Sequence, residues 1–382
     1  MYNIFAYGSM IGDRQRAGAY ARALRRAVKP GAVVLDLGCG TGFFALLACQ
    51  FGAGRVYAVE PDGVIEVAKK IARANGYADR IEFIQDLSSH IILPELADVV
   101  VADIRGVLPV FGHSLPAIID ARRRLLAPGG ILIPQCDTLW AAMVEAPDLY
   151  RSYTAPWEDN GFGFQMEAAR VMATNFPRRK RILPEQLLVK PQCWATLNYA
   201  DLESANVSGE LSWTLERPGV AHGLAVWFDA VLMDGVEYSN APGAPELIYS
   251  QFFFPLPQPV NLSAGDQTHL SLKADLIGEN YTWRWHTTFL EPGISGPVKA
   301  EFKQSDFLGE SWSLPRLRKL ADRFVPNLNM SGEIDRFILT KMTGETSLAE
   351  IAHQLVVQFP KTFTTFLEAL TRVGEMSEKY SS

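Results

Sequence analysis

The fold is decided by the stretch Val33-Val34-Leu35-Asp36-Leu37-Gly38-Cys39-Gly40-Thr41-Gly42. Its apolar, β-branched start predicts a strand, and the residues around the last glycine begin a helical pattern over 41–51. Because glycine has no Cβ, Gly38, Gly40 and Gly42 allow a ligand to approach the backbone, and the helix start offers unpaired N–H groups. A dinucleotide fingerprint needs a third glycine where Phe43 stands, so this turn argues against a pyrophosphate site.

Short β-branched runs alternate with helical patterns from this stretch to residue 134. The predicted strands are 33–35, 55–59, 81–84, 98–102 and 131–133, and the predicted helices are 41–51, 63–75 and 114–126. Such alternation predicts a parallel sheet with helices on both faces. Ligands of these sheets bind outside the carboxyl ends of the strands, so we expect the functional residues there.

Carboxylates and polar residues follow these strands at the edge where a ligand would bind. Glu60 ends the second strand about 20 residues after the glycine turn, where a carboxylate would accept both hydroxyl protons of a ribose. Asp86, Ser88 and Ser89 follow the third strand, where this fold places an adenine ring. The alternatives are that Glu60 is a solvated acid at a strand end and that the other three are ordinary loop residues.

Length and composition limit the classes of function. With 382 residues, 48% of them hydrophobic and 20% charged, the chain has room for two or three folded domains. The net charge of -6 gives no general attraction to nucleic acid, although Arg178-Arg179-Lys180-Arg181 is a basic patch, either a solvated loop or a polyanion site. The four cysteines lack zinc-ligand spacing, which predicts reduced thiols and no metal. Without a signal peptide or a long apolar run, we expect a cytoplasmic protein with no membrane segment.

The second half of the chain has a different pattern. Short strands separated by glycine, proline and polar residues predict an antiparallel barrel or sandwich; they are 194–197, 220–232, 251–254, 268–274 and 281–289. Residues 166–188 have a helical pattern that includes the basic patch. Residues 334–380 predict three helices, with Gly344 and Pro360 between them.

The glycine turn and the N-terminal segment together resemble a known family. The G-x-G-x-G spacing after a strand that contains Asp36 looks like motif I of class I S-adenosylmethionine-dependent methyltransferases. The segment from Tyr7 to Arg16, with Tyr20 beyond it, is similar to the segment that covers the cofactor in protein arginine methyltransferases. This resemblance implies S-adenosyl-L-methionine as cofactor, with Met10 near its sulfonium and Arg16 on its carboxylate, since a guanidinium forks onto a carboxylate. The predicted cofactor site comprises Met10, Arg16, Asp36, Gly38, Gly40, Gly42, Glu60, Asp86, Ser88 and Ser89.

The resemblance also implies an architecture. Residues 157–164 look like the link between the two family domains, and 220–229 look like a family barrel strand. We therefore expect an α/β class I methyltransferase domain with a Rossmann-like sheet in 1–137 and an antiparallel β-barrel substrate domain in 138–308. A helical arm at about 165–190 falls where the family carries its dimerisation arm, so the resemblance implies a homodimer.

The acceptor loops depart from the family pattern. The family uses two glutamates to hold a substrate guanidinium; here Asp103 takes the first position and Gly112 the second. The Thr-His-Trp loop of the family corresponds to Leu247-Ile248-Tyr249, so its histidine is missing. One aspartate beside Arg105 offers a buried guanidinium little net attraction. We therefore predict a methyltransferase acting on a peptide, protein or amino-acid-like acceptor other than a protein arginine.

Three residues are candidates for the acceptor chemistry. Asp103 or His113 would take a proton from an amine, hydroxyl or ring nitrogen, and Tyr249 would orient the acceptor. Arg105 would instead attract a carboxylate. The ordinary alternatives are that His113 starts a helix and that Arg105 faces solvent. Two other functions stay open: an arginine N-methyltransferase with a rebuilt acceptor site, and a non-catalytic scaffold that binds the cofactor.

Residues 309–382 lie outside the arginine methyltransferase pattern. Residues 332–339 and 344–352 look like parts of small winged-helix or peptide-recognition modules of bacterial modifying enzymes. We expect a small C-terminal helical domain that either caps the barrel or docks a leader peptide or partner protein.

Overall fold

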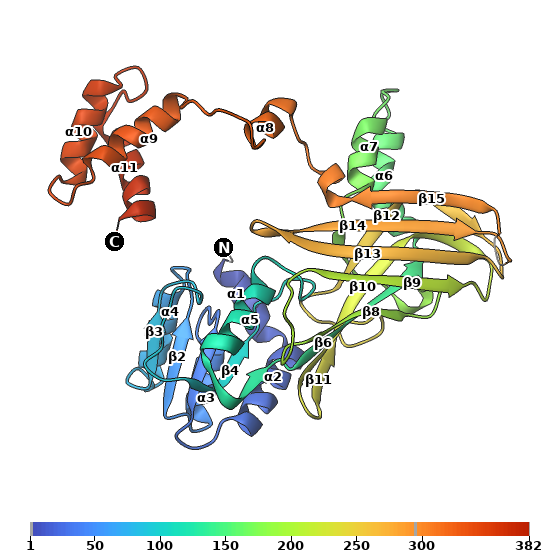
Figure 1. Cartoon of the computed structure of the whole chain (residues 1–382), viewed down its shortest axis with the longest axis horizontal. Coiled ribbons are helices and arrows are strands. Elements are labelled where there is room, and N and C mark those ends of the chain that lie inside the picture. The colour runs from blue at the N-terminus through green and yellow to red at the C-terminus, as the bar shows by residue number, and fades with distance from the viewer. Residues whose placement is uncertain (1–2, 294–295, 382) are drawn as a thin grey trace. The chain divides into compact units, whose positions relative to one another are not determined.

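The computed structural model describes residues 3–293 and 296–381 (Figure 1). The chain divides into two compact units, residues 1–310 and 311–382. The first unit contains a parallel sheet and an antiparallel β domain, and the second contains helices. In the part of the chain that the structure describes, no helix combines the length and the apolar character needed to cross a membrane.

The parallel sheet has five strands in the order β3-β2-β1-β4-β5. Its strands are β1 Val33–Leu37, β2 Arg55–Val59, β3 Ile81–Ile84, β4 Ala97–Ala102 and β5 Leu126–Ile133. The chain first adds β2 and β3 on one side of β1 and then returns to add β4 and β5 on the other. The strand order therefore reverses next to β1, which is the position where open α/β sheets bind ligands.

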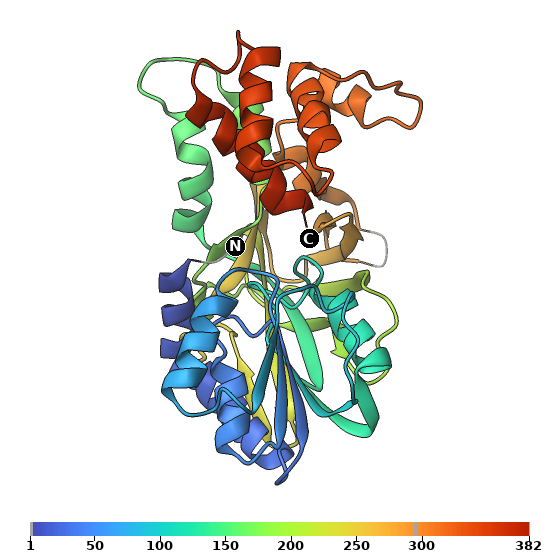
Figure 2. The ribbon, with the colours of Figure 1, turned by 90° about the vertical axis from the view of Figure 1, so that its left-hand side faces the viewer.

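Helices cover this sheet, as the sequence predicts. They are α1 Ile4–Gly12, α2 Arg14–Ala27, α3 Phe43–Gln50, α4 Ile65–Ala74 and α5 Ser114–Arg124. Figure 2 shows α4, in light blue, and α5, in teal, on opposite sides of the sheet. Val34, Val56 and Val100 on the inner strands are fully buried, because helices exclude water from both faces. The predicted α/β fold is confirmed.

The antiparallel domain consists of two sheets. One has the order β7-β12-β10-β6-β8, with β11 paired to β10, and the other has the order β15-β14-β13-β9. Their strands are β6 Cys136–Val144, β7 Arg178–Lys180, β8 Gln192–Asn198, β9 Val207–Thr214, β10 Gly219–Met233, β11 Val236–Ser239, β12 Gln251–Leu262, β13 Gln267–Ile277, β14 Asn280–Leu290 and β15 Val298–Ser305. The aromatic side chains of Phe254 and Trp285 are buried between the sheets with ring centroids 5.1 Å apart.

The helical arm is shorter than its sequence pattern predicts. After α6 Pro147–Glu158, helix α7 Glu167–Thr174 ends before Pro177, and the next residues form β7. Proline disfavours helical backbone in the residue before it, and its ring excludes a helical neighbour. The prediction of a helix over 166–188 is therefore wrong beyond residue 174. Arg178, Arg179 and Lys180 instead pair with the edge of β12.

The C-terminal unit has a small core of its own. Its helices are α8 Leu314–Lys319, α9 Met330–Lys341, α10 Leu348–Gln358 and α11 Phe366–Tyr380. Ile338, Leu355 and Val373, one from each of the last three helices, are fully buried against each other. Ser347 and Thr365 start α10 and α11 with capping boxes, in which a glutamate side chain returns to the cap. The three helices predicted for 334–380 are thus confirmed.

Candidate functional site

The glycine turn follows the central strand β1 and has a conformation that suits glycine. Gly38, Gly40 and Gly42 have φ values of 71°, 52° and 80°, in the region that side chains disfavour. A Cβ on Gly38 would collide with Ile104, and one on Gly40 would lie 2.5 Å from the ring of Tyr7. The turn is therefore closely packed by the loop after β4 and by α1: a side chain at Gly38 would displace Ile104, and one at Gly40 would displace Tyr7.

Two carboxylates hold this turn. Asp36 is buried, and its Oδ2 accepts a hydrogen bond from the N–H of Ala45 at 2.8 Å, which fixes the start of α3. Burial, together with the charges of Glu60 and Asp103, raises the pKa of Asp36 to about 7. Glu60 accepts from the N–H of Gly40 at 2.9 Å and from the N–H of Asp62 at 3.0 Å. Each oxygen of Glu60 keeps a second lone pair that can accept another hydrogen bond.

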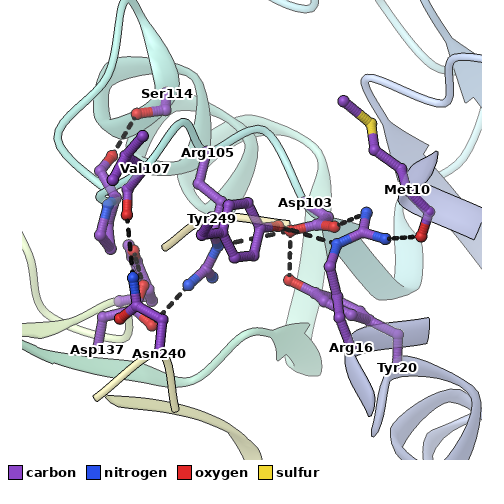
Figure 3. A network of polar contacts seen from close by, with 12 residues as sticks. Met10, Arg16, Tyr20, Asp103, Arg105, Val107, Ser114, Asp137, Asn240 and Tyr249 are labelled. Carbon is purple, nitrogen blue, oxygen red and sulfur yellow. Dashed lines mark hydrogen bonds and ion pairs between the residues drawn. The ribbon is translucent and has the colours of Figure 1, made fainter. Parts of the chain in front are cut away.

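Arg16 of α2 and Asp103 at the end of β4 form a buried ion pair. The Arg16 Nε donates to the hydroxyl of Tyr249 at 2.9 Å, and its Nη1 donates to the carbonyl of Met10 at 2.8 Å. Burial alone would lower the pKa of Arg16, but the nearby Asp103 carboxylate raises it above its ordinary value. Figure 3 shows the guanidinium of Arg16 between Met10 and Asp103. Three of its five N–H donors are used, so two can still meet a ligand.

Asp103 is surrounded by donors. Its Oδ1 accepts from the hydroxyls of Tyr20 at 3.0 Å and Tyr249 at 3.1 Å, and it lies 3.5 Å from the Nε of Arg105. Burial and the negative charge of Asp103 raise the pKa values of Tyr20 and Tyr249 well above their ordinary range. Both tyrosines therefore stay protonated and donate to Asp103.

Arg105 does not face solvent. Its Nη1 donates to Asp137 of β6 at 2.8 Å, and Asp137 accepts the hydroxyl of Tyr199 at 2.5 Å. The guanidinium also lies 5.0 Å from the ring centre of Phe228, close enough for a cation–π contact. This pair joins the loop after β4 to the antiparallel domain. Its signal in the sequence is Asp137 itself, a lone charge in the apolar strand that ends at Val144.

Asn240 connects the two loops that carry these residues. Its Oδ1 accepts from the N–H of Phe228 at 2.8 Å, and its Nδ2 donates to the carbonyl of Ser250 and, at 3.4 Å, to that of Val107 (Figure 3). Ser250 has a φ of 52°, an unusual backbone conformation for a residue with a side chain. Asn240 therefore holds the backbone next to Tyr249 in place. The sequence gives no sign of this role, because the three partners are far apart along the chain.

Arg16, Glu60, Asp103, Arg105 and Tyr249 line one cavity of about 740 Å³, here called the main cavity. Its volume lies within the range of small-molecule sites. It opens beside the carboxyl ends of β1, β2 and β4, where the parallel sheet is expected to bind a ligand. The lining residues are Ala6, Tyr7, Ser9, Met10, Arg16, Gly38, Glu60, Pro61, Asp62, Asp103, Ile104, Arg105, Gly106, Val107, Phe111, Arg179, Ile248 and Tyr249.

Six of the predicted site residues meet in the main cavity. They are Met10, Arg16, Gly38, Glu60, Asp103 and Tyr249. Asp36, Gly40 and Gly42 support the turn without being among the described lining residues. Tyr7, Arg179 and Phe111 also line it. The sequence places Tyr7 in the segment that resembles the cofactor cover of the family and Arg179 in the basic patch, but it marks neither as a residue of this cavity, and it gives no sign of Phe111.

The structure does not bring the other four predicted residues into the described lining of the main cavity. His113 is half exposed, and its Nε2 pairs with Glu279 at 3.1 Å. Asp86 pairs with the Nδ1 of His90 at 3.0 Å on an exposed loop. Ser88 and Ser89 lie on the same loop, and the Ser88 carbonyl accepts a hydrogen bond from Arg124 at 2.9 Å.

Two family models match neighbouring parts of the first unit and overlap at residues 135–143. Residues 13–143 match the family described as ribosomal protein L11 methyltransferase (PrmA). Residues 135–281 match the arginine methyltransferase oligomerization subdomain. The first match covers the parallel sheet, and the second covers most of the antiparallel domain.

Solved structures of arginine methyltransferases have the same fold. The Trypanosoma brucei protein arginine methyltransferase 1 enzyme–prozyme complex with S-adenosylhomocysteine superposes with a TM-score of 0.71 and 21% identity, over 79% of this chain and 98% of that one. Arabidopsis thaliana protein arginine methyltransferase 10 gives a TM-score of 0.68 and 22% identity, over 79% of this chain and 97% of that one.

Curated relatives are more similar in sequence. A probable protein arginine N-methyltransferase 6 of Arabidopsis thaliana is 31% identical over 62% of this chain, but the match spans only 55% of that relative, less than two thirds of it. An arginine N(omega)-methyltransferase of Streptomyces achromogenes subsp. streptozoticus is 31% identical over 69% of this chain and 74% of its own length. This chain therefore belongs to the arginine methyltransferase family of class I S-adenosylmethionine-dependent methyltransferases.

Proposed function

We propose that this protein transfers a methyl group from S-adenosylmethionine to an acceptor that enters the main cavity beside Asp103 and Tyr249. The observation that carries the proposal is that one cavity is lined by both sets of groups. Gly38, Glu60 and Arg16 are on its cofactor side, and Asp103 and Tyr249 are on its acceptor side.

The residues present fit the cofactor by their chemistry. Glu60 has lone pairs left for the two ribose hydroxyls, and Arg16 has two N–H donors left for the methionine carboxylate. Gly38 brings backbone rather than a side chain to the wall of the cavity. Met10 adds a soft, apolar thioether to the wall.

The acceptor side has groups that can align a nucleophile and hold a proton. When bound, S-adenosylmethionine would supply a methyl group carried on a sulfonium. As the bond from the methyl carbon to the acceptor nitrogen forms, the S–CH₃ bond breaks and its electron pair stays on sulfur. Asp103 takes the proton that this nitrogen loses, and the Tyr249 oxygen, which keeps a free lone pair, accepts an acceptor N–H. The sulfonium is already an activated methyl donor, so alignment of the acceptor contributes most of the rate.

An arginine guanidinium is the first acceptor to consider. It is supported by the relatives, which are named as arginine or protein arginine methyltransferases, and it replaces the acceptor other than arginine that the sequence predicts. The pairing of Arg16 with Asp103 explains how cofactor binding would create a site for the acceptor guanidinium. A cofactor carboxylate on Arg16 would weaken its hold on Asp103, which would free negative charge for the incoming guanidinium.

A neutral nitrogen or oxygen acceptor is the second candidate, and one observation favours it. Arg16 and Arg105 balance the charges of Asp103 and Asp137, so a cationic acceptor meets no net negative charge in this network.

The test is methyl transfer from radiolabelled S-adenosylmethionine to free arginine, to arginine peptides and to peptides without arginine, followed by amino-acid analysis. Methylarginine would support the first candidate, and label on another residue alone would support the second. Cofactor binding without transfer to any acceptor would instead support the non-catalytic scaffold.

We also propose that the protein is a cytoplasmic homodimer. The match of residues 135–281 to the oligomerization subdomain supports self-association. Phe162 and Phe164, between α6 and α7, are stacked on each other and 82% and 69% exposed, so they offer an apolar surface. Cys39, Cys49, Cys136 and Cys193 are all free thiols, which suits a reducing compartment. Sedimentation of the Phe162→Ser/Phe164→Ser variant as a monomer, with the wild type as a dimer, would support the segment between α6 and α7 as the contact.

A further inference from the structure

The basic patch, residues 178–181, includes strand β7, and its cationic side chains contact different parts of the molecule. In β7, Arg178 and Lys180 lie over the ring of Tyr153, each 5.6 Å from its centre. Arg179, between them, lines the main cavity. This division follows from strand geometry, because successive side chains point to opposite faces. Arg181, just beyond the strand, pairs with Glu246 at 3.0 Å.

Arg179 has no carboxylate partner among residues 3–293 and 296–381. Its Nη1 donates to the carbonyl of Ile248 at 2.8 Å, which holds the guanidinium next to Tyr249. Its other N–H donors have no hydrogen-bond acceptor within the described part of the chain. A guanidinium held in this way presents donors that match the two oxygens of a carboxylate.

The charges of the other cavity residues make Arg179 distinctive. Arg16 and Arg105 are neutralised by Asp103 and Asp137, so the buried part of the acceptor side is close to neutral. Arg179 is then a positive charge beside Tyr249 with no carboxylate partner among the described residues, since the other two carboxylates of the described lining, Glu60 and Asp62, follow β2 on the cofactor side. An acceptor with a carboxylate is attracted there, and an arginine within a basic peptide is repelled.

We propose that Arg179 binds a carboxylate of the acceptor, which makes the acceptor an arginine that carries its own carboxylate. This inference rests on the proposed methyl transfer to a guanidinium. The carboxylate can come from two sources, the α-carboxyl group of free arginine or a carboxylate close to an arginine in a peptide. Both offer the same chemistry to Arg179.

The test compares acceptors that differ only in the carboxylate. L-arginine and agmatine share the guanidinium, and agmatine lacks the carboxyl group. A peptide that ends in arginine, made with a free or an amidated C-terminus, provides the same comparison for the second source. Methyl transfer to each is measured with the wild type and with Arg179→Gln, after calorimetry has shown that both bind S-adenosylhomocysteine.

We expect the wild type to prefer each carboxylate-bearing acceptor by about 3- to 10-fold in kcat/KM, because Arg179 is exposed and solvent screens its charge. Arg179→Gln should bring L-arginine down to the level of agmatine, and Arg179→Lys should keep part of the preference. Arg181→Gln is the matched control, since it removes a cation from the same patch outside the described lining of the main cavity. It should keep the full preference.

Equal transfer within both pairs, L-arginine with agmatine and the free with the amidated peptide, or an unchanged preference in Arg179→Gln, would overturn the inference. So would binding of S-adenosylhomocysteine without transfer to any of these arginine acceptors, while the cofactor assignment would stand. If neither protein bound S-adenosylhomocysteine, the proposed function itself would fail. A preference found only with the free C-terminal peptide would assign the carboxylate to a peptide and support the inference in that form.

Discussion

Arg16 and Asp103 form an ion pair that joins the N-terminal helix α2 to the end of β4. The two residues have different assigned roles in the main cavity, since Arg16 is assigned to the cofactor and Asp103 to the acceptor. Arg16→Ala should therefore weaken S-adenosylhomocysteine binding about 10- to 100-fold, the effect of losing charged hydrogen bonds. Calorimetry measures this effect, and Arg14→Ala, an exposed arginine of the same helix, is the control. Equal affinity in the Arg16 and Arg14 variants would contradict the assignment.

Asp36 should make stability depend on pH. Its pKa is raised from 3.8 to about 7, chiefly by burial, so the folded protein holds a proton that the unfolded chain releases. Stability contributed by this group is present below about pH 4 and is lost as pH rises towards 7, by at most about 4 kcal/mol. Asp36→Asn keeps an acceptor for the Ala45 N–H but has no proton to lose.

Urea unfolding of the wild type and Asp36→Asn at about pH 5 and pH 8 measures this difference. The wild type should lose more stability than the variant between the two pH values. Identical losses in the two proteins would mean that Asp36 does not change its protonation in this range.

The parallel sheet could be predicted from the sequence because its signals are local. The strand bounds 55–59 and 81–84 were predicted to the residue, since apolar runs and helical periodicity are both short-range patterns. Strand β12 was predicted to end at residue 254 but continues to Leu262. The second half of β12 does not look like a strand in the sequence because it contains Pro255, Pro257 and Pro259, and proline lacks the N–H that a strand normally uses.

The candidate site was predictable only where a motif or the family resemblance marks it. Glu60 and Gly38 follow strands, and Arg16 was assigned by resemblance. The pairing of Arg105 with Asp137 and the connection through Asn240 depend on contacts between distant segments, which no local pattern encodes. The position of His113 depends on such a contact too: its place in the loop suggests the site, but its side chain pairs with Glu279 outside the described lining of the main cavity.

Asn240 should contribute to stability through its three hydrogen bonds. Asn240→Ala would leave the Phe228 N–H and the Ser250 and Val107 carbonyls with fewer partners, and we expect a loss of about 1–3 kcal/mol. Urea unfolding measures the loss, with Asn261→Ala at an exposed position of β12 as control. If Asn240→Ala were as stable as the control, these hydrogen bonds would not contribute to the free energy of unfolding.

The C-terminal unit should be dispensable for cofactor binding. Its core is separate, and the residues that line the main cavity all lie before residue 250. Deletion of residues 325–382 should leave the affinity for S-adenosylhomocysteine unchanged in calorimetry. Unchanged turnover of a full-length protein substrate would also rule out substrate delivery by this unit. A clear loss of cofactor affinity would contradict the conclusion that the C-terminal unit takes no part in cofactor binding.

The most direct test of the account is a calorimetric titration of the wild type and Glu60→Gln with S-adenosylhomocysteine. Glu60 lines the main cavity, and its remaining lone pairs are assigned to the ribose hydroxyls. We predict saturable binding of one molecule per chain, weakened about 10- to 100-fold in Glu60→Gln, because an amide is a poorer acceptor than a carboxylate. Absence of binding to the wild type, or equal affinity in the two proteins, would contradict the assignment of the main cavity to the cofactor.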